Sequence, residues 1–293
     1  MSMLTFTKMQ GLGNDFMVIE SFTQSFTPDA ERIRQWSDRR FGVGFDQLLW
    51  LSPAQDSRHV ACYRIFNADG TEAMQCGNGA RCIGRFLVDR GYHTGHDPFT
   101  VEMLNGDAIQ IQQISVDQYA IEIGVPEFLP QNIPFDPTDA TQVNVVANQQ
   151  NQYQVSIEEC GKRQDIQFGV VSLGNPHAVI FVEDLQTTPV AEWGAYIQHL
   201  TAFPEQVNVG FAERTSEQQI KLRVFERGSG ETLACGTGAC AAMVIGRQLG
   251  LLDSTVMVEQ QGGKSQISWK KEGDSVSLVG PAEDVFQAQL SIA

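Results

Sequence analysis

One short cysteine motif occurs twice in this chain, and the repetition limits the folds that the sequence can adopt. Cys76-Gly77-Asn78-Gly79-Ala80 recurs as Cys235-Gly236-Thr237-Gly238-Ala239. Each copy has a glutamate four residues before its cysteine and a phenylalanine ten residues before it, and a glycine follows at the same distance in both. Matching residue types at matching spacings indicate an internal repeat.

The repeat extends over most of the chain. Leu12-Gly13-Asn14 matches Leu173-Gly174-Asn175, and Thr27-Pro28 matches Thr188-Pro189 at the same separation. A length difference of two residues between Gln47 and Phe66 brings these matches into register with the cysteine motifs. The sequence therefore predicts a tandem duplication, with two similar half-proteins on one chain.

The duplication suggests how the two cysteines meet. If the halves pack about a pseudo-twofold axis, Cys76 and Cys235 face each other across the cleft between them. Two opposed thiols can address both faces of one carbon.

Length and charge point to a two-domain enzyme in the cytoplasm. At 293 residues the chain suits two domains of roughly 130 to 150 residues. Its formal charge of −15 repels phosphate backbones and anionic lipids, so we expect neither nucleic acid nor membrane as a partner. The first residues lack the pattern of a signal peptide, and no apolar run approaches the ~20 residues of a membrane span.

The six cysteines are too sparse for a disulfide scaffold and are expected to be thiols. Their spacing differs from that of zinc knuckles and histidine is scarce nearby, so no metal site is predicted. Four of them are expected to be small buried side chains: Cys62, Cys82, Cys160 and Cys240.

Alternating apolar and polar residues predict strands over residues 59–67, 108–124 and 219–227, and most of the chain reads as strand. Helices are predicted after Thr27-Pro28 to about Arg39 and after Thr188-Pro189 to about Leu200. In both, the threonine would be the cap and the proline would lie in the first turn.

Two further helices are predicted to begin at the cysteine motifs. Apolar residues recur at helical spacing after Cys76, and residues 239–245 are apolar all round, as in a helix buried inside a sheet or barrel. Each helix should end near its closing glycine, Gly91 or Gly250.

A cysteine at a helix start lies beside unpaired backbone N–H groups and the positive end of the helix dipole. Both favour the thiolate and can lower the pKa of the thiol. The same N–H groups can bind a carboxylate. One thiolate could then remove an α-proton while the opposite thiol delivers a proton to the other face, which inverts the stereocentre without a cofactor.

Several motifs resemble the diaminopimelate epimerase family, in the same order along nearly the whole chain. Besides the two cysteine motifs they are Gly11-Leu12-Gly13-Asn14-Asp15-Phe16, Gly44-Phe45-Asp46-Gln47, Phe66-Asn67-Ala68-Asp69-Gly70, Gly174-Asn175-Pro176-His177-Ala178, Val207-Asn208-Val209 and Phe225-Glu226-Arg227-Gly228. The resemblance implies a cofactor-independent isomerase that interconverts LL- and meso-diaminopimelate in bacterial lysine and peptidoglycan synthesis.

The same resemblance implies the fold. It is an α+β fold of two pseudo-symmetric domains, each a mixed sheet or barrel wrapped round a central helix. The last strand crosses back to the first domain. The halves would then be residues 1–130 with 280–293, which carry Cys76, and residues 131–279, which carry Cys235.

Carried over residue by residue, the resemblance implies that Cys76 and Cys235 are the acid/base thiols and that His177 and Glu226 support them. The residues that hold the reacting carboxylate at the helix starts would be Gly77, Asn78, Gly236 and Thr237. The remaining substrate contacts would be Asn14, Gln47, Asn67, Asn175, Asn208, Glu226 and Arg227.

The repeat itself supports a substrate with two amino-acid ends. Asn67 and Glu226 are equivalent positions, so only the second half offers an adjacent anion and cation, Glu226-Arg227. Such a pair suits a zwitterionic group, because arginine grips a carboxylate while glutamate accepts from an ammonium. The alternative is a salt bridge between the two at a strand end. The asparagines alone could be turn residues, and His177 alone is more typical of a packing or orienting side chain.

Other readings stay open. Proline racemase and hydroxyproline epimerase also use a cysteine pair, but they usually carry His after the first Cys-Gly and Ser-Pro before the second cysteine, where Asn78 and Leu233-Ala234 stand here. A phenazine-biosynthesis isomerase shares the architecture without the cysteine pair. A thiol redox or metal-binding protein is a different class of function, and a zinc titration and a thiol count would distinguish it.

Two departures from the family pattern limit the transfer. Residues 131–167 are rich in Gln and Asn and predict a lengthened linker and surface hairpin. Val285-Phe286 stands where many family members have a tyrosine in dimer contacts, and a homodimer is what the rest of the resemblance implies.

Overall fold

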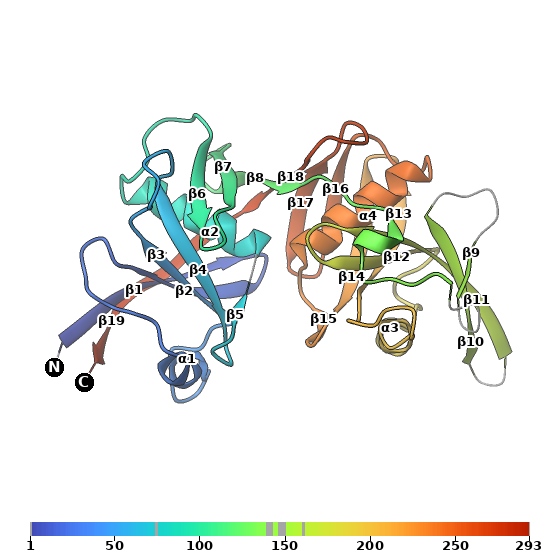
Figure 1. The fold of residues 1–293 in the computed structure, drawn as a ribbon, viewed down its shortest axis with the longest axis horizontal. Helices are drawn as coiled ribbons and strands as arrows, with labels where there is room; N and C mark the ends of the chain where they lie inside the picture. The colour runs from blue at the N-terminus through green and yellow to red at the C-terminus, as the bar shows by residue number, and fades with distance from the viewer. Residues whose placement is uncertain (1, 74–75, 139–142, 146–150, 160–161, 293) are drawn as a thin grey trace. The chain divides into compact units, whose positions relative to one another are not determined.

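The computed structural model describes residues 2–73, 76–138, 143–145, 151–159 and 162–292. The chain forms two compact units, Met1–Glu122 with Val279–Ala293 as unit 1 and Ile123–Leu278 as unit 2. It passes from unit 1 to unit 2 within strand β8 (Gln118–Gly124) and returns within strand β18 (Val276–Pro281), as Figure 1 shows.

Unit 1 consists mainly of strands. Its elements in chain order are β1 (Ser2–Gly11), β2 (Asn14–Glu20), α1 (Ala30–Ser37), β3 (Gln47–Ser52), β4 (Ala61–Asn67), β5 (Glu72–Ala73), α2 (Gly77–Asp89), β6 (Phe99–Met103), β7 (Ala108–Gln113) and, after the return of the chain, β19 (Glu283–Ile292).

Unit 2 repeats this order from β11 onward. Its elements are the 3₁₀ helix η1 (Pro130–Asn132), β9 (Val143–Val145), β10 (Gln152–Glu159), β11 (Lys162–Ser172), β12 (Pro176–Val182), α3 (Val190–Gln198), β13 (Asn208–Ser216), β14 (Gln219–Glu226), β15 (Gly230–Thr232), α4 (Gly236–Gln248), β16 (Thr255–Gln260) and β17 (Gly263–Ser268).

Strand pairing confirms the duplication at the level of single residues. β2 pairs in parallel with β3 with Phe16 opposite Gln47, and β12 pairs in parallel with β13 with His177 opposite Asn208. These pairs are equivalent in the sequence repeat. The predicted α+β fold of two pseudo-symmetric domains with mixed sheets is therefore confirmed.

The length difference between the repeats lies in one connection. A loop of residues 53–60 joins β3 to β4, whereas residues 217 and 218 alone join β13 to β14. In unit 2 the pairing continues to Ser216 opposite Gln219, and a register shift follows Arg214. The second unit thus has a tight hairpin where the first has a loop.

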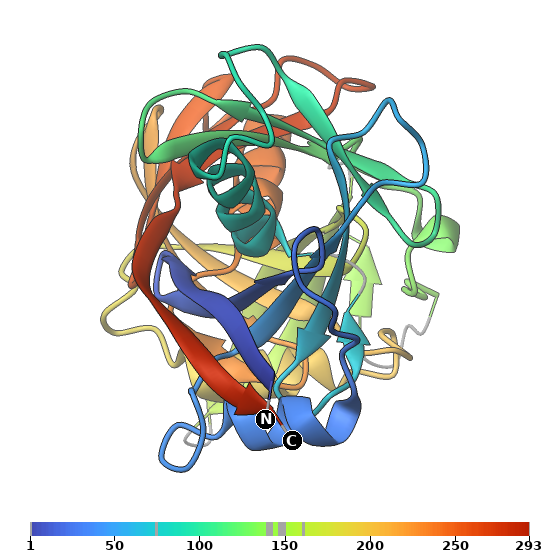
Figure 2. The ribbon, with the colours of Figure 1, turned by 90° about the vertical axis from the view of Figure 1, so that its left-hand side faces the viewer.

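A central helix lies among the strands of each unit. α2 contacts β1, β2 and β7, and α4 contacts β11, β12, β13, β14, β16 and β17. Figure 2 shows α2 end-on, in teal, with strands of unit 1 around it. Side chains of α4 from Gly238 to Gly246 are all buried, which confirms the helix predicted to be apolar on all sides. Gly91 and Gly250 follow the helix ends with φ of 74° and 70°, as expected of C-terminal caps.

The two smaller helices form where predicted, but their caps differ from the prediction. Asp29 is the N-cap of α1, and its carboxylate accepts from the Arg32 N–H at 2.9 Å. Pro189 is the N-cap of α3 and provides no side-chain hydrogen bond. Thr27 and Thr188 therefore lie before the caps, because the helices begin one or two residues later than the Thr-Pro pattern indicates.

Each small helix covers one face of its unit's sheet through a separate apolar core. In unit 1 the core joins Ile33 of α1 to residues of β1, β2 and β3. In unit 2 the core joins Val190 and Ile197 of α3 to residues of β10 to β13. Within the segment 131–167, the described residues Phe135 and Ile157 belong to this core. The β10–β11 hairpin therefore packs against the core, whereas its composition predicts a surface hairpin.

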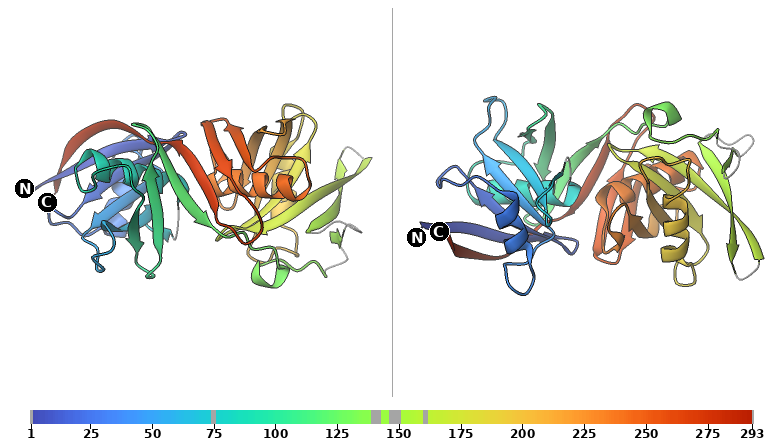
Figure 3. Two further views of the ribbon diagram at one scale, coloured as in Figure 1. Left: turned by 90° about the horizontal axis from the view of Figure 1, so that it is seen from above. Right: turned by 60° about the horizontal axis from the view of Figure 1, so that its bottom comes forward.

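The two ends of the chain belong to the same sheet. β1 pairs antiparallel with β19, from Ser2 opposite Ile292 to Gln10 opposite Glu283, and Figure 3 shows the two strands side by side. None of the helices that the structure describes is both long enough and apolar enough to span a membrane.

Candidate active site

Each repeated cysteine is the N-cap of its central helix. Cys76 precedes α2 and Cys235 precedes α4, both with extended backbone angles. The Cys76 Sγ accepts from the Gly79 N–H at 3.4 Å, and the Cys235 Sγ accepts from the Gly238 N–H at 3.4 Å. The predicted helix starts are thus confirmed, and each sulfur lies beside N–H groups of the kind that bind anions.

Cys76 is half-buried and lies next to two carboxamides. Its Sγ is 3.6 Å from the Asn14 Oδ1, which also accepts from the Asn78 Nδ2 at 3.4 Å. Asn78 is only 4% exposed, and its Oδ1 accepts from the Arg81 guanidinium at 2.8 Å. Two predicted substrate contacts, Asn14 and Asn78, therefore meet at this cysteine.

Cys235 lies in a drier environment. It is 5% exposed, its backbone N–H donates to the Gln260 Oε1 at 2.7 Å, and its Sγ is 3.7 Å from the Thr237 hydroxyl. Burial raises the pKa of this thiol well above its usual value, and the negative charge of Glu226 raises it further. The prediction that a helix start lowers the pKa is wrong for Cys235, because desolvation outweighs the nearby N–H group.

Glu226 is the last residue of strand β14 and Arg227 follows it, and the two side chains do not pair with each other. The Thr232 hydroxyl donates to the Glu226 carboxylate. The Arg227 guanidinium donates to the Glu205 carbonyl at 3.1 Å, and its backbone N–H donates to the Asn208 Oδ1 at 2.9 Å. Among the residues described, no ion pair joins Glu226 to Arg227. The structure therefore does not contain the strand-end salt bridge that was the alternative.

Gln47 and Asn67 lie opposite each other on β3 and β4. The Gln47 Nε2 donates to the Asn67 Oδ1 at 2.9 Å, and the Asn67 Nδ2 donates to the Thr71 hydroxyl at 3.1 Å. The Gln47 Oε1 is buried and has no hydrogen-bond partner among the described residues. This acceptor is therefore available to a ligand donor.

His177 is fully buried and neutral. Burial, together with the smaller effect of the positive charge of Arg227, lowers its pKa to about 3. Its Nε2 lies 3.0 Å from the Asn175 Oδ1, which can only accept, so the ring hydrogen is assigned to Nε2. The Nδ1 has no hydrogen-bond partner in the described part of the chain. A neutral imidazole with a bare nitrogen can accept a hydrogen bond but carries no charge.

We expect His177→Gln to make the protein less sensitive to acid. The pKa of His177 is about 3 in the folded protein and about 6.5 ordinarily, so only the unfolded chain takes up this proton between those pH values. The resulting loss of stability is absent above about pH 6.5 and grows as the pH falls below it.

Urea unfolding gives the free energy of unfolding at pH 7 and at pH 4.5. The decrease in this free energy between the two pH values should be roughly 2 to 3 kcal/mol smaller in His177→Gln than in the parent protein. The exposed His199 offers a control, since His199→Gln should behave like the parent. Equal acid sensitivity of His177→Gln and the parent would contradict the buried, neutral state.

Several polar residues around the cysteines escaped the sequence analysis. Asp46 accepts from the Asn14 Nδ2 at 2.9 Å, and Arg81 donates to Asn78. Asp46 lies in the motif Gly44-Phe45-Asp46-Gln47. Its position beside Gln47 is the only feature of the sequence that could have indicated a role at the site. Gln260 lies at the end of β16, and no pattern in the sequence distinguishes it.

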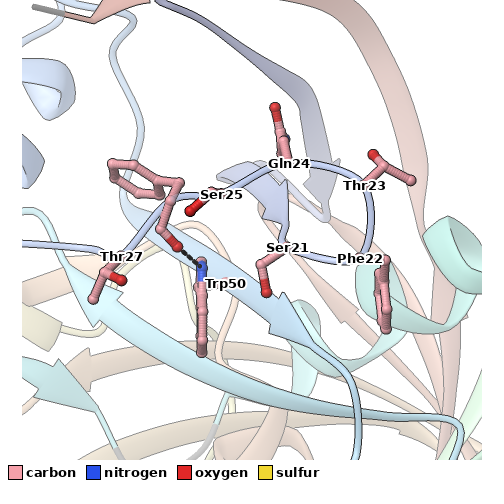
Figure 4. A pocket seen from close by; sticks show the side chains of 8 residues that line it. Ser21, Phe22, Thr23, Gln24, Ser25, Thr27 and Trp50 are labelled. Atoms are coloured by element: carbon pink, nitrogen blue, oxygen red, sulfur yellow. Dashed lines mark hydrogen bonds between the residues drawn. The ribbon is translucent and has the colours of Figure 1, made fainter.

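Other candidate sites lie apart from these residues. A surface pocket of unit 1 is lined by residues 21–27 and Trp50, whose Nε1 donates to the Phe26 carbonyl at 3.2 Å (Figure 4). No cysteine and no predicted site residue lines this pocket. In the part of the chain that the structure covers, no three His, Cys, Asp or Glu side chains are grouped to hold a metal ion. Cys62, Cys82 and Cys240 are buried as expected, and Cys160 lies outside the described residues.

Comparison with known proteins gives consistent matches over the chain. A family model described as diaminopimelate epimerase matches residues 6–129 and 169–285. The diaminopimelate epimerase of Chromobacterium violaceum is 45% identical over 289 residues, with 99% of each protein covered. The diaminopimelate epimerase of Neisseria meningitidis is 47% identical over 295 residues, again with 99% of each covered.

Solved structures with low sequence identity share the fold. A hydroxyproline epimerase from Agrobacterium vitis has a TM-score of 0.67 at 16% identity, with 98% of this chain and 92% of that chain covered. A phenazine biosynthesis protein of the PhzF family from Bacillus anthracis has a TM-score of 0.65 at 16% identity, with both chains covered completely. Both architectural resemblances expected from the sequence are thus confirmed.

Proposed function

The chain belongs to the diaminopimelate epimerase family, and we propose that it interconverts LL- and meso-diaminopimelate in the cytoplasm without a cofactor. The reaction would serve lysine and peptidoglycan synthesis. The observation that carries the proposal is the position of the cysteines, because each is the N-cap of a central helix at equivalent points of a duplicated fold.

The chemistry follows from what each helix start offers. We propose that the substrate carboxylate binds the N–H groups that begin α2 and α4, at Gly77, Asn78, Gly236 and Thr237. One cysteine, as thiolate, takes the α-proton and the other, as thiol, gives a proton to the opposite face. The carbanion is stabilised as an enolate-like species by the same N–H donors. The mechanism requires the two halves, residues 1–130 with 280–293 and residues 131–279, to present their sulfurs to one carbon.

The surroundings of Cys235 support a proton donor in the resting protein. Its raised pKa keeps the thiol protonated at neutral pH. Glu226 is close enough to raise that pKa by its charge and by a hydrogen bond, so we propose that Glu226 is the group to which the Cys235 proton can move. In the reverse direction Cys235 would then act as the base.

The distal end of the substrate needs groups of both charges. We propose that Arg227 binds the distal carboxylate, because its guanidinium is exposed and has only a backbone carbonyl as its hydrogen-bond acceptor among the described residues. Predicted contacts that complete the site are Asn14, Gln47, Asn67, Asn175, Asn208 and Glu226, with His177 as a neutral support. A homodimer stays a prediction of the family resemblance.

Incubation of LL-diaminopimelate with the protein in D₂O tests the proposed function. The expected product is meso-diaminopimelate with deuterium at the inverted α-carbon, formed with a chelator present and with no pyridoxal phosphate added. NMR reports both the isomer and the isotope. Product that forms without deuterium from the solvent would exclude proton transfer by the cysteines, and no product at all would exclude the substrate.

A further inference from the structure

A chain of hydrogen bonds runs past Cys76 from a buried cation to a carboxylate. The Arg81 guanidinium, fully buried, donates to the Asn78 Oδ1 at 2.8 Å, and the Asn78 Nδ2 donates to the Asn14 Oδ1 at 3.4 Å. The Asn14 Nδ2 then donates to the Asp46 Oδ2 at 2.9 Å. The Cys76 Sγ lies beside this chain, 3.6 Å from the Asn14 Oδ1.

The two groups that end this chain of hydrogen bonds, Arg81 and Asp46, determine the orientation of the carboxamides between them. A guanidinium can only donate and a carboxylate can only accept. The Asn78 oxygen must therefore face Arg81 and the Asn14 NH₂ group must face Asp46. As a result, the Asn14 carbonyl oxygen is turned toward Cys76, and reversal of the Asn14 amide would set its oxygen against the Asp46 carboxylate.

Asp46 is held in place by a cluster of charges. Arg39 donates to its Oδ1 at 2.6 Å and forms two hydrogen bonds with Asp15 at 2.7 and 2.9 Å. Lys8 also pairs with Asp15. Burial alone would raise the pKa of Asp15, but hydrogen bonds from Arg39 and Lys8 lower it to about 2. The acceptor end of the chain is therefore anchored by ionised groups.

The contacts of Cys76 fit a protonated sulfur. The Sγ accepts from the Gly79 N–H at 3.4 Å, which either protonation state allows. The Asn14 Oδ1 is an acceptor, so its contact at 3.6 Å is favourable only if the sulfur carries the hydrogen. A thiolate has no hydrogen to donate, so it would face the Asn14 carbonyl oxygen without a hydrogen bond.

The second half of the protein has no charged residues at the positions equivalent to those that orient Asn14 and Asn78. The repeat positions of Asp15, Arg39, Asp46 and Arg81 carry residues without charge, which are Pro176, Leu200, Val207 and Cys240. The Asn175 Oδ1 meets His177 rather than a chain that leads to a carboxylate. At these repeat positions, the charged anchor is thus present beside Cys76 and not beside Cys235.

We propose that Asp46 is a positioning residue, which through the Asn14 carboxamide holds Cys76 as a thiol in the ligand-free protein. The inference deepens the proposed function, on which it rests, because it adds a residue that sets the starting protonation of one of the two thiols. Substrate binding would have to displace the Asn14 oxygen, and the half-buried Cys76 would have to release its proton to solvent water, before Cys76 could act as a base.

The pH dependence of Cys76 alone can test this, because the neighbouring ionisable groups do not compete with it. Among the described residues, Tyr63 on β4 and Cys82 on α2 interact electrostatically with Cys76. The hydrogen-bond chain and its anchor add Lys8 on β1, Asp15 on β2, Arg39 after α1, Asp46 before β3 and Arg81 on α2. Burial raises the pKa of Tyr63 and of Cys82, so both stay neutral near pH 8.

The main experiment compares two neutral replacements, Asp46→Leu and Asp46→Asn. Both remove the charge, but only asparagine keeps a carbonyl that can accept from the Asn14 Nδ2. Alkylation by iodoacetamide at a series of pH values, read at the Cys76 peptide by mass spectrometry, gives the midpoint for thiolate formation. We expect the midpoint in Asp46→Leu to lie about one pH unit below that in Asp46→Asn, because Asn14 can then turn its NH₂ group to the sulfur.

Equal midpoints in the two variants would show that only the charge of Asp46 matters and would overturn the proposal. A second measurement avoids any variant at Asp46. The S–H stretching band that is present in the parent protein at pH 7 and absent in Cys76→Ala reports the protonated sulfur, and its absence from the parent would also overturn the proposal. Neither measurement requires the protein to convert substrate. Failure of this proposal can therefore be distinguished from failure of the proposed function in the deuterium experiment.

Discussion

Alanine in place of Cys76 or Cys235 is expected to lower the rate of epimerisation by at least about a thousandfold, the usual contribution of a general acid or base. Each thiol serves one face of the α-carbon in the proposed mechanism, so the loss of either interrupts the transfer. The two single variants should fail to similar degrees, and the double variant should be little worse than either alone.

The chain supplies matched controls for this experiment. Cys82 and Cys240 lie on the same helices, fully buried, and are not proposed to touch the substrate. Cys82→Ala and Cys240→Ala should keep the rate within a few-fold of the parent value, apart from any loss of stability, which circular dichroism on heating would reveal. Retention of more than about a tenth of the rate in Cys76→Ala or Cys235→Ala would contradict the two-thiol mechanism.

Arg227→Ala is expected to weaken binding of diaminopimelate by about 2 kcal/mol, roughly thirtyfold in KM, because a charge-assisted contact to the distal carboxylate would be lost. The side chain is exposed, and the hydrogen bond that it forms within the described part of the chain is to a backbone carbonyl. The free energy of unfolding should therefore change by less than about 0.5 kcal/mol. Steady-state kinetics and urea unfolding of the same preparation measure both quantities.

A second arginine substitution separates recognition from general charge. Arg214 is also exposed, on the neighbouring strand β13, and pairs with Glu217 at 3.4 Å. Arg214→Ala removes the same charge from the same unit and should leave KM unchanged. Arg227→Lys should recover part of the affinity, because lysine keeps the charge but lacks the planar fork of the guanidinium. An unchanged KM in Arg227→Ala would refute the distal contact.

Local patterns predicted the parts of the fold that neighbouring residues determine. The glycines after each cysteine allow the chain to turn into a helix, so the starts of α2 and α4 could be identified from a few residues. The cap of α1 was missed because Asp29 competes with Thr27 for the same role, and the sequence alone does not determine which residue takes the extended conformation.

The electrostatics of the site could not be predicted in the same way. The pKa of Cys235 depends on burial and on Glu226, which lies at the end of strand β14. Gln260 reaches the Cys235 N–H from 25 residues further along the chain. Asp46 acts through Asn14, and the sequence shows neither the contact nor the direction in which the amide faces. Such properties arise from packing between distant segments, which no local pattern encodes.

The pairing of β1 with β19 imposes an order on biosynthesis. Unit 2 is one continuous stretch, Ile123–Leu278, so all of its residues are synthesised before residues 283–292. Unit 1 must wait with the edge of β1 uncovered until residues 283–292 emerge. A released chain that lacks residues 283–292 would therefore contain all of unit 2 and a unit 1 with an open β-edge, which favours aggregation.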